Sequence, residues 1–276
     1  TWLYYTLLRC EELTGEKPWS EAWVMGYGLD EKGMKMSKSK GNAIDPLPVI
    51  EKLGADTFRF WSASEINHGY DFRCNEQKIE STKKFLSKLW NVSRFLSSFP
   101  VIDSGIPNAS DKWILSELDK LVKECKKGYE EYNFFIPAIA IREFTWNVFA
   151  AHYIEMVKAR AYGIDFSDEE RDGAIFTLHK TLATILKLLA PITPFITEHL
   201  WKTLYSDQSI HKEKQVNSEN IEVQTDITKE ISEFNSKVWN EKKSQNLSLK
   251  DAIKIEIPEI LQPFKKDLKS MHNLID

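Results

Sequence analysis

The chain has 276 residues and a formal net charge of −4 at pH 7, with 42% hydrophobic and 28% charged residues. This length allows two or three compact units, and the composition excludes a mainly disordered chain. Because the overall charge is acidic, any contact with a nucleic acid must come from a local basic patch.

The N-terminal part, residues 1–99, begins with an apolar pattern at 1–13 that predicts a helix. A short apolar run at 22–29 predicts a buried strand, and the turn at 30–33 leads into a loop rich in lysine and serine, 34–42. We therefore expect a polar loop that extends from the end of a buried strand.

Three helices are predicted between this loop and the first linker. Asp45 and Pro46 open a short helix that ends at Gly54, and 55–63 forms a second. The third, 76–99, carries an apolar stripe and an almost purely basic remainder. Such a basic face can neutralise RNA phosphates, and its binding would weaken steeply with salt.

The candidate RNA contacts of this third helix are four basic residues and one aromatic residue, Lys83, Lys84, Lys88, Arg94 and Phe95. Phe95 could stack on an unpaired base, although packing into the core is the favoured environment for both Phe95 and Trp90. The lysines could instead simply solvate a surface helix.

Residues 100–109 are predicted to form a linker, and the next unit, 110–206, is predicted to be a bundle of about four helices. The predicted helices begin at an N-cap, Ser110, and span 110–129, 138–162, 168–189 and 195–205. His152 and His199 lie on these helices without nucleophile and carboxylate partners at matching spacing, so we expect them to be packed or hydrogen-bonded.

The last unit, 220–276, follows a polar stretch without periodicity. Alternating patterns at 221–224 and 253–257 predict strands, and helices are expected at 228–243 and 261–274. The predicted fold class is therefore mainly α, with a small α/β module at the C-terminal end.

The chain contains neither an apolar run long enough to cross a bilayer nor the order of a signal peptide at its start, so we expect a cytoplasmic protein with no membrane partner. Its three cysteines, Cys10, Cys74 and Cys125, are far apart and form no C-x-x-C pair. They indicate neither a disulfide framework nor a zinc site, and no bound metal or prosthetic group is expected.

The loop residues Lys35, Met36, Ser37, Lys38 and Ser39 suit a nucleotide's polyphosphate. Lysine acts as a movable point charge, while hydroxyls and free backbone N–H groups supply donors. A Walker A loop is excluded, because Gly33 is not followed by the spacing of that motif. From charge alone, a solvated basic turn would remain the favoured interpretation.

The string at 35–39 is nevertheless the KMSKS signature of class I aminoacyl-tRNA synthetases, and the chain resembles their valine and isoleucine branch. The resemblance covers nearly the whole chain and is carried by segments 40–46, 52–60, 88–95, 113–116, 146–155, 191–198 and 239–258. Segment 88–95 is similar to the valine type more than to the isoleucine type, and the tail resembles the archaeal form.

This resemblance implies that 1–99 is the end of a Rossmann-type catalytic domain with its connecting helices. It implies that 110–206 is an anticodon-binding bundle and that 220–276 is a small appended module. The implied reaction has two steps: ATP and valine form valyl-adenylate and pyrophosphate, and the valyl group then passes to tRNA.

In that reaction, the resemblance implies that Lys38 is the chief cation on the triphosphate and Lys35 its helper. Ser37 and Ser39 would close the loop onto ATP, which would enter as a substrate with Mg²⁺. The expected partners are therefore ATP, valine and tRNA, bound by a monomer.

The chain departs from the family in one respect. Such enzymes also use a His-x-Gly-His signature, which none of the six histidines forms. Their valine pocket and editing domain would lie upstream, so this C-terminal part alone is expected to be inactive. A tRNA-binding fragment or paralogue without adenylate chemistry, and isoleucine in place of valine, remain alternatives. An unrelated helical scaffold would require the loop match to be chance.

Overall fold

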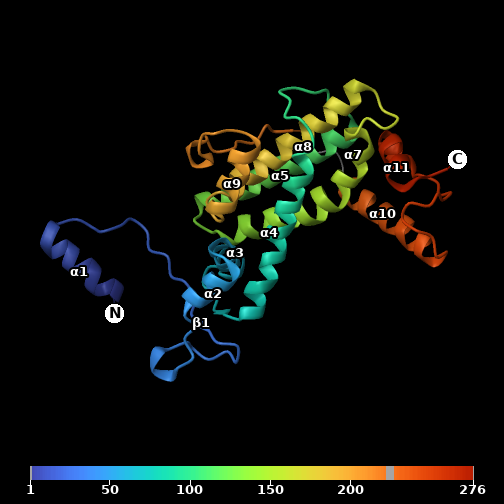
Figure 1. Ribbon diagram of the computed structural model, residues 1–276. Coiled ribbons are helices and arrows are strands. Elements are labelled where there is room, and N and C mark those ends of the chain that lie inside the picture. Colours follow the sequence, from blue (N-terminus) through green and yellow to red (C-terminus); the bar gives the residue numbers. More distant parts are fainter. Residues whose placement is uncertain (1, 222–226, 276) are drawn as a thin grey trace.

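The computed structural model describes residues 2–221 and 227–275, most of which are helical (Figure 1). The first elements are α1 (Trp2–Thr14), β1 (Gly28–Leu29), η1 (Lys38–Lys40), α2 (Pro46–Leu53), α3 (Ala55–Glu65), β2 (Phe72–Arg73) and α4 (Glu76–Leu96). The middle elements are α5 (Ala109–Glu130), α6 (Phe135–Glu143), η2 (Phe144–Tyr153), α7 (Ile154–Ala161), α8 (Asp168–Leu189) and α9 (Pro194–Leu204). The last are η3 (Ile210–Lys212), α10 (Ile227–Ser244), η4 (Glu259–Phe264) and α11 (Lys265–His272). The prediction of a mainly α fold is confirmed.

Helix α1 lies apart from the other elements, at the end of an extended segment (Figure 1). None of its residues is buried.

Across the described ranges, no helix combines the length and the apolar content that a membrane crossing requires. The three cysteines are free thiols, of which Cys74 and Cys125 are buried.

Strands β1 and β2 pair in parallel, with Gly28 opposite Phe72. The strand predicted at 22–29 is therefore correct in position but too long, since Met25 makes only an isolated bridge with His68. A strand extends only as far as a neighbour can satisfy its backbone groups, and β2 has two residues.

One continuous apolar core joins α4 to the bundle and to the C-terminal helices. It includes fully buried Leu89 of α4, Ile141 of α6, Leu182 of α8 and Leu268 of α11. A smaller cluster, which includes Ile79, packs α2 and α3 against the start of α4. Helix α4 thus belongs to both clusters and connects the two ends of the packed body (Figure 1).

Helix α5 is capped by Asn108, so the predicted N-cap, Ser110, is wrong. The Asn108 side chain accepts a hydrogen bond from the Asp111 N–H at 3.2 Å, and the Asp111 carboxylate accepts one from the Asn108 N–H at 2.9 Å. This reciprocal capping box satisfies two N–H groups that the first turn leaves free. Ser110 is buried inside that turn.

The helix predicted at 138–162 runs without interruption from Phe135 to Ala161, but its middle, η2, is π-helical. A π segment widens the turn, so residues no longer follow the three and four spacing of an α-helix. Trp146 lies in this segment and is 38% exposed.

The helix predicted at 228–243 agrees with α10, whereas the one predicted at 261–274 begins as the 3-10 helix η4 and is α-helical only in α11. The strand predicted at 253–257 is reduced to one parallel bridge between Ile253 and Leu274, because the described part of the chain offers it no longer neighbouring strand. Its alternation instead reflects a loop that buries Ile253 and Ile257. The strand predicted at 221–224 falls mostly on residues 222–226, outside the described residues.

A buried polar group joins η2, α10 and α11. The Asn235 amide contacts Nδ1 of His152 at 3.0 Å and Nε2 of His272 at 2.7 Å. Burial lowers the pKa of His152, and burial together with the nearby Lys242 ammonium lowers the pKa of His272 to about 4. Both imidazoles are therefore neutral at pH 7.

Acid should consequently weaken the attachment of α11. An unfolded histidine has a pKa of about 6.5, so the unfolded chain binds more protons between pH 6.5 and 4. The stabilisation is complete above this window and is lost as the pH falls through it. Between pH 7 and pH 5, the contribution of His272 to the free energy of unfolding should fall by about 2 kcal/mol. Urea unfolding at pH 7 and pH 5 should show a smaller pH effect for His272→Gln than for the wild type. Equal pH effects would contradict this assignment.

Candidate ATP loop and RNA-binding face

The lysine and serine loop begins directly after β1 and is bonded back to it. The Met36 N–H donates to the Gly28 carbonyl at 3.2 Å, and Leu29 forms an antiparallel bridge with Lys35. A Cβ on Gly28 would lie 2.7 Å from the Met36 methyl group, so glycine leaves room for that side chain. Met36 packs against the smaller apolar cluster. The Lys35 ammonium lies 4.1 Å from the Tyr27 ring centroid, a cation–π contact.

Asp30 and Asn42 close the base of the loop. The Asn42 amide nitrogen donates to the Asp30 carboxylate at 2.9 Å, and its oxygen accepts from the Ser37 N–H at 2.9 Å. The bond from Asn42, followed by one from the Met34 N–H, lowers the pKa of Asp30. Asp30 is therefore ionised at neutral pH and remains an acceptor for both donors.

The tip of the loop is exposed. Lys38 and Lys40 are the first and last residues of η1, and both are exposed to solvent. Within the described ranges, neither forms an ion pair. The hydroxyls of Ser37 and Ser39 lie 2.7 Å apart. A fixed base with exposed ammonium and hydroxyl groups at its tip is suited to contact an anionic ligand.

The RNA candidates of α4 form two groups. Lys83, Lys84 and Lys88 line a hollow of about 450 Å³ together with Trp146 of η2. Arg94 lies outside this hollow, near the end of α4, at a rise of about 9 Å from Lys88. The start of α4 adjoins the lysine and serine loop, since residues of both line another hollow.

Phe95 belongs to an aromatic group at the end of α4. Its ring lies 5.3 Å from Phe99 and 6.3 Å from Tyr162, between centroids, and the Lys158 ammonium lies 5.7 Å from the Phe95 centroid. Phe95 is half-buried against the main core, as expected. Tyr162 is 53% exposed.

Trp90 is not a core residue, so that prediction was wrong. It is 43% exposed and stacks on His199 with centroids 5.5 Å apart. His199, its stacking partner on α9, is exposed as well. The expectation for His152 is confirmed, since it is hydrogen-bonded, whereas His199 stacks on Trp90 but remains solvent-exposed.

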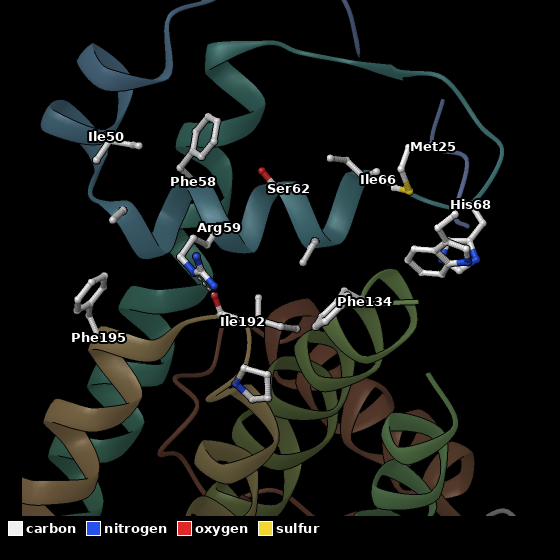
Figure 2. Close-up of a pocket in the computed structure, with 14 residues that line it drawn as sticks. Met25, Ile50, Phe58, Arg59, Ser62, Ile66, His68, Phe134, Ile192 and Phe195 are labelled. Atoms are coloured by element: carbon white, nitrogen blue, oxygen red, sulfur yellow. Dashed lines mark hydrogen bonds between the residues drawn. The ribbon is translucent and has the colours of Figure 1, made fainter. Parts of the chain in front are cut away.

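An apolar hollow of about 640 Å³ separates α3 from the turn that precedes α9 (Figure 2). Two hydrogen bonds hold its walls together. Arg59 Nε donates to the Ile192 carbonyl at 3.0 Å, and the Asp56 carboxylate accepts from the Ile196 N–H at 2.7 Å. The second bond satisfies a free N–H in the first turn of α9, where Thr193 provides no side-chain cap. Together they fix α3 to the start of α9.

Sequence reasoning missed several contributors to these sites. Asp30 was predicted only as a turn residue, and Asn42 only as part of the extended signature, because a side-chain pair 12 residues apart has no signal in local spacing. Trp146 was noted only within a segment of the family resemblance, and its contact with α4, like that of Tyr162, was missed because the partners are far away in the sequence.

The comparisons with known proteins agree with this architecture. Residues 111–257, more than half of the chain, match the family model of the anticodon-binding domain of tRNA ligase. Residues 1–75 match the model of class I tRNA synthetases (I, L, M and V). The chain therefore belongs to the class I tRNA ligases that carry this anticodon-binding domain.

Its curated relatives are valine–tRNA ligases. The chain is 42% identical over its whole length to the valine–tRNA ligase of Pyrobaculum aerophilum and covers 35% of that relative. It is 40% identical to that of Nanoarchaeum equitans and 38% identical to that of Aeropyrum pernix, with 99% of the chain aligned and 36% and 34% of the relatives covered. These relatives do not favour the isoleucine alternative. The chain spans about a third of their length and corresponds to a C-terminal part.

A solved structure shares the fold. It is a LeuRS of Agrobacterium radiobacter K84 in a ternary complex with tRNA and LeuAMS. The TM-score is 0.62 at 21% identity, over 79% of this chain and 26% of that one. At this identity the similarity establishes the arrangement of helices alone.

Proposed function

We propose that this chain is the part of a valine–tRNA ligase that supplies the lysine loop of the ATP site and a surface for tRNA. The loop at 35–39 carries the proposal: Asp30 and Asn42 fix its base, while Lys38 remains exposed and unpaired by any described residue. A cation held in this way can follow the charge of a leaving group.

In the proposed first step, a valine carboxylate oxygen attacks the α-phosphorus of ATP. The bond from that phosphorus to the bridging oxygen breaks, and its electron pair leaves with pyrophosphate. Lys38 would stabilise the charge that develops there, Lys35 would assist from its place over Tyr27, and Ser37 and Ser39 would donate hydrogen bonds. Mg²⁺ would arrive with ATP as part of the substrate.

This chain alone is not proposed to activate valine, because it lacks the histidine signature. Its proposed units remain 1–99, 110–206 and 220–276. ATP, valine and tRNA are its proposed partners in a monomeric, cytoplasmic ligase.

The RNA surface is tested by replacing Lys83, Lys84 and Lys88 together by alanine. Binding of the chain to a fluorescently labelled tRNA with a valine anticodon should weaken, and the slope of log affinity against log salt should fall by about 2 to 3, because each phosphate contact contributes roughly 0.7 to 0.9. Fluorescence anisotropy between about 50 and 200 mM salt measures both quantities.

A triple alanine variant of Lys229, Lys237 and Lys243 provides a matched control, because these exposed α10 lysines carry the same charge. It should bind tRNA nearly as the wild type does. Equal losses in the two triple variants would show a general charge effect and would contradict the assignment to α4.

A further inference from the structure

The hollow beside α4 contains an aromatic residue that phosphate binding alone does not explain. Trp146 is 38% exposed, although indole is largely apolar and its exposure to water is unfavourable. The other residues that line the hollow are polar or charged: Glu80, Lys83, Lys84, Ser87, Lys88 and Asn91.

The charge around Trp146 is predominantly positive. The lining of the hollow contains three ammonium groups and one carboxylate, that of Glu80. Within residues 2–221 and 227–275, Lys83, Lys84 and Lys88 form no ion pair. The Lys88 ammonium lies 5.9 Å from the Trp146 ring centroid. The Lys88 cation therefore adjoins the indole, and Lys83 and Lys84 line the same hollow.

An indole beside several unpaired lysines suits one kind of ligand in particular. Every nucleobase has a π face that can stack on an aromatic ring, and the phosphates of the same strand pair with neighbouring cations. A duplex cannot present its bases in this way, whereas loops and other unpaired segments of folded RNA can.

We propose that Trp146 stacks on an unpaired base of bound RNA while Lys83 and Lys84 hold phosphates of the same strand. Lys88, which lies beside the ring, pairs with the phosphate adjoining that base. This inference rests on the proposed tRNA-binding function and adds a base-stacking site to a face otherwise assigned to phosphate contact.

The test measures tRNA affinity and its salt dependence for Trp146→Ala and Trp146→Phe in the same chain. Trp146→Ala should weaken binding about tenfold, which lies within the range of roughly fivefold to 150-fold that the loss of one base–aromatic stack produces. The salt slope should not change, since no charge is removed. Trp146→Phe should retain most of the affinity because a ring remains.

Trp90→Ala is the matched control, because Trp90 has similar exposure (43%) but lies outside the hollow, against His199. It should bind tRNA as the wild type does, and circular dichroism melting would establish that every variant is folded.

Two outcomes would overturn the stacking site: wild-type affinity in Trp146→Ala, or equal losses in folded Trp146→Ala and Trp146→Phe. If the triple lysine variant still loses affinity in that case, the proposed tRNA surface stands without the stack. If neither the lysines nor Trp146 affects binding, the proposed surface fails as well.

Discussion

Replacing Arg160 by alanine should lower the free energy of unfolding by about 3 to 5 kcal/mol. Arg160 is fully buried, and its two terminal nitrogens contact the two oxygens of Asp111 at 2.8 and 2.7 Å. Its Nε contacts Asp267 at 3.1 Å. Without the guanidinium, two carboxylates would remain buried without their cation, which costs far more than the loss of a surface ion pair.

The same guanidinium connects three helices. Asp111 belongs to the capping box of α5, Arg160 to α7 and Asp267 to α11. The Tyr153 hydroxyl adds a bond to Asp111 at 2.6 Å. Loss of Arg160 should therefore detach α11 as well as loosen the start of α5.

Urea unfolding at pH 7 measures this effect, with Arg171→Ala as the control. Arg171 pairs with Asp168 at 2.7 Å but is 38% exposed, so its loss should cost less than about 1 kcal/mol. If Arg160→Ala lowered the free energy of unfolding as little as Arg171→Ala, the buried network would contribute little to stability.

The second large effect is expected from Lys38→Ala. The assay requires a complete ligase, which can be assembled by joining this chain to the upstream two thirds of the Pyrobaculum aerophilum relative. We expect the kcat/KM for ATP in valine-dependent pyrophosphate exchange to fall roughly 100-fold to 1000-fold, the range found when one preorganised donor to a developing charge is removed. Folding should be unaffected, because the side chain is exposed.

Lys40→Ala removes the same charge two residues further on, outside the signature, and should change the rate only a few-fold. Comparable losses for the two variants would show that the loop contributes general positive charge instead of one positioned ammonium. An assembled ligase that binds tRNA but forms no adenylate even with the wild-type loop would favour the alternative, a tRNA-binding paralogue.

Long amphipathic helices were predictable because their apolar stripes recur over many turns. The predicted helix at 168–189 coincides with α8, and that at 76–99 extends only three residues past α4. The prediction failed where a neighbour decides the outcome. The alternation at 253–257 could not reveal that, among residues 2–221 and 227–275, it pairs through a single bridge to Leu274.

The candidate sites were only partly predictable for the same reason. The lysine loop is one continuous string, so its residues could be named without the fold. Its closure depends on the pairing of Asp30 with Asn42, and the hollow at α4 depends on a π-helical turn that brings Trp146 beside Lys88. Neither contact can be predicted from the spacing of neighbouring residues in the sequence.

Pyrophosphate exchange by the assembled ligase with both Lys35 and Lys38 replaced by alanine is the most direct measurement of the loop's role. We expect valine-dependent exchange to be nearly abolished, while tRNA binding by the α4 face stays as strong as in the wild type. An unchanged exchange rate would contradict the proposal that these lysines bind the triphosphate of ATP.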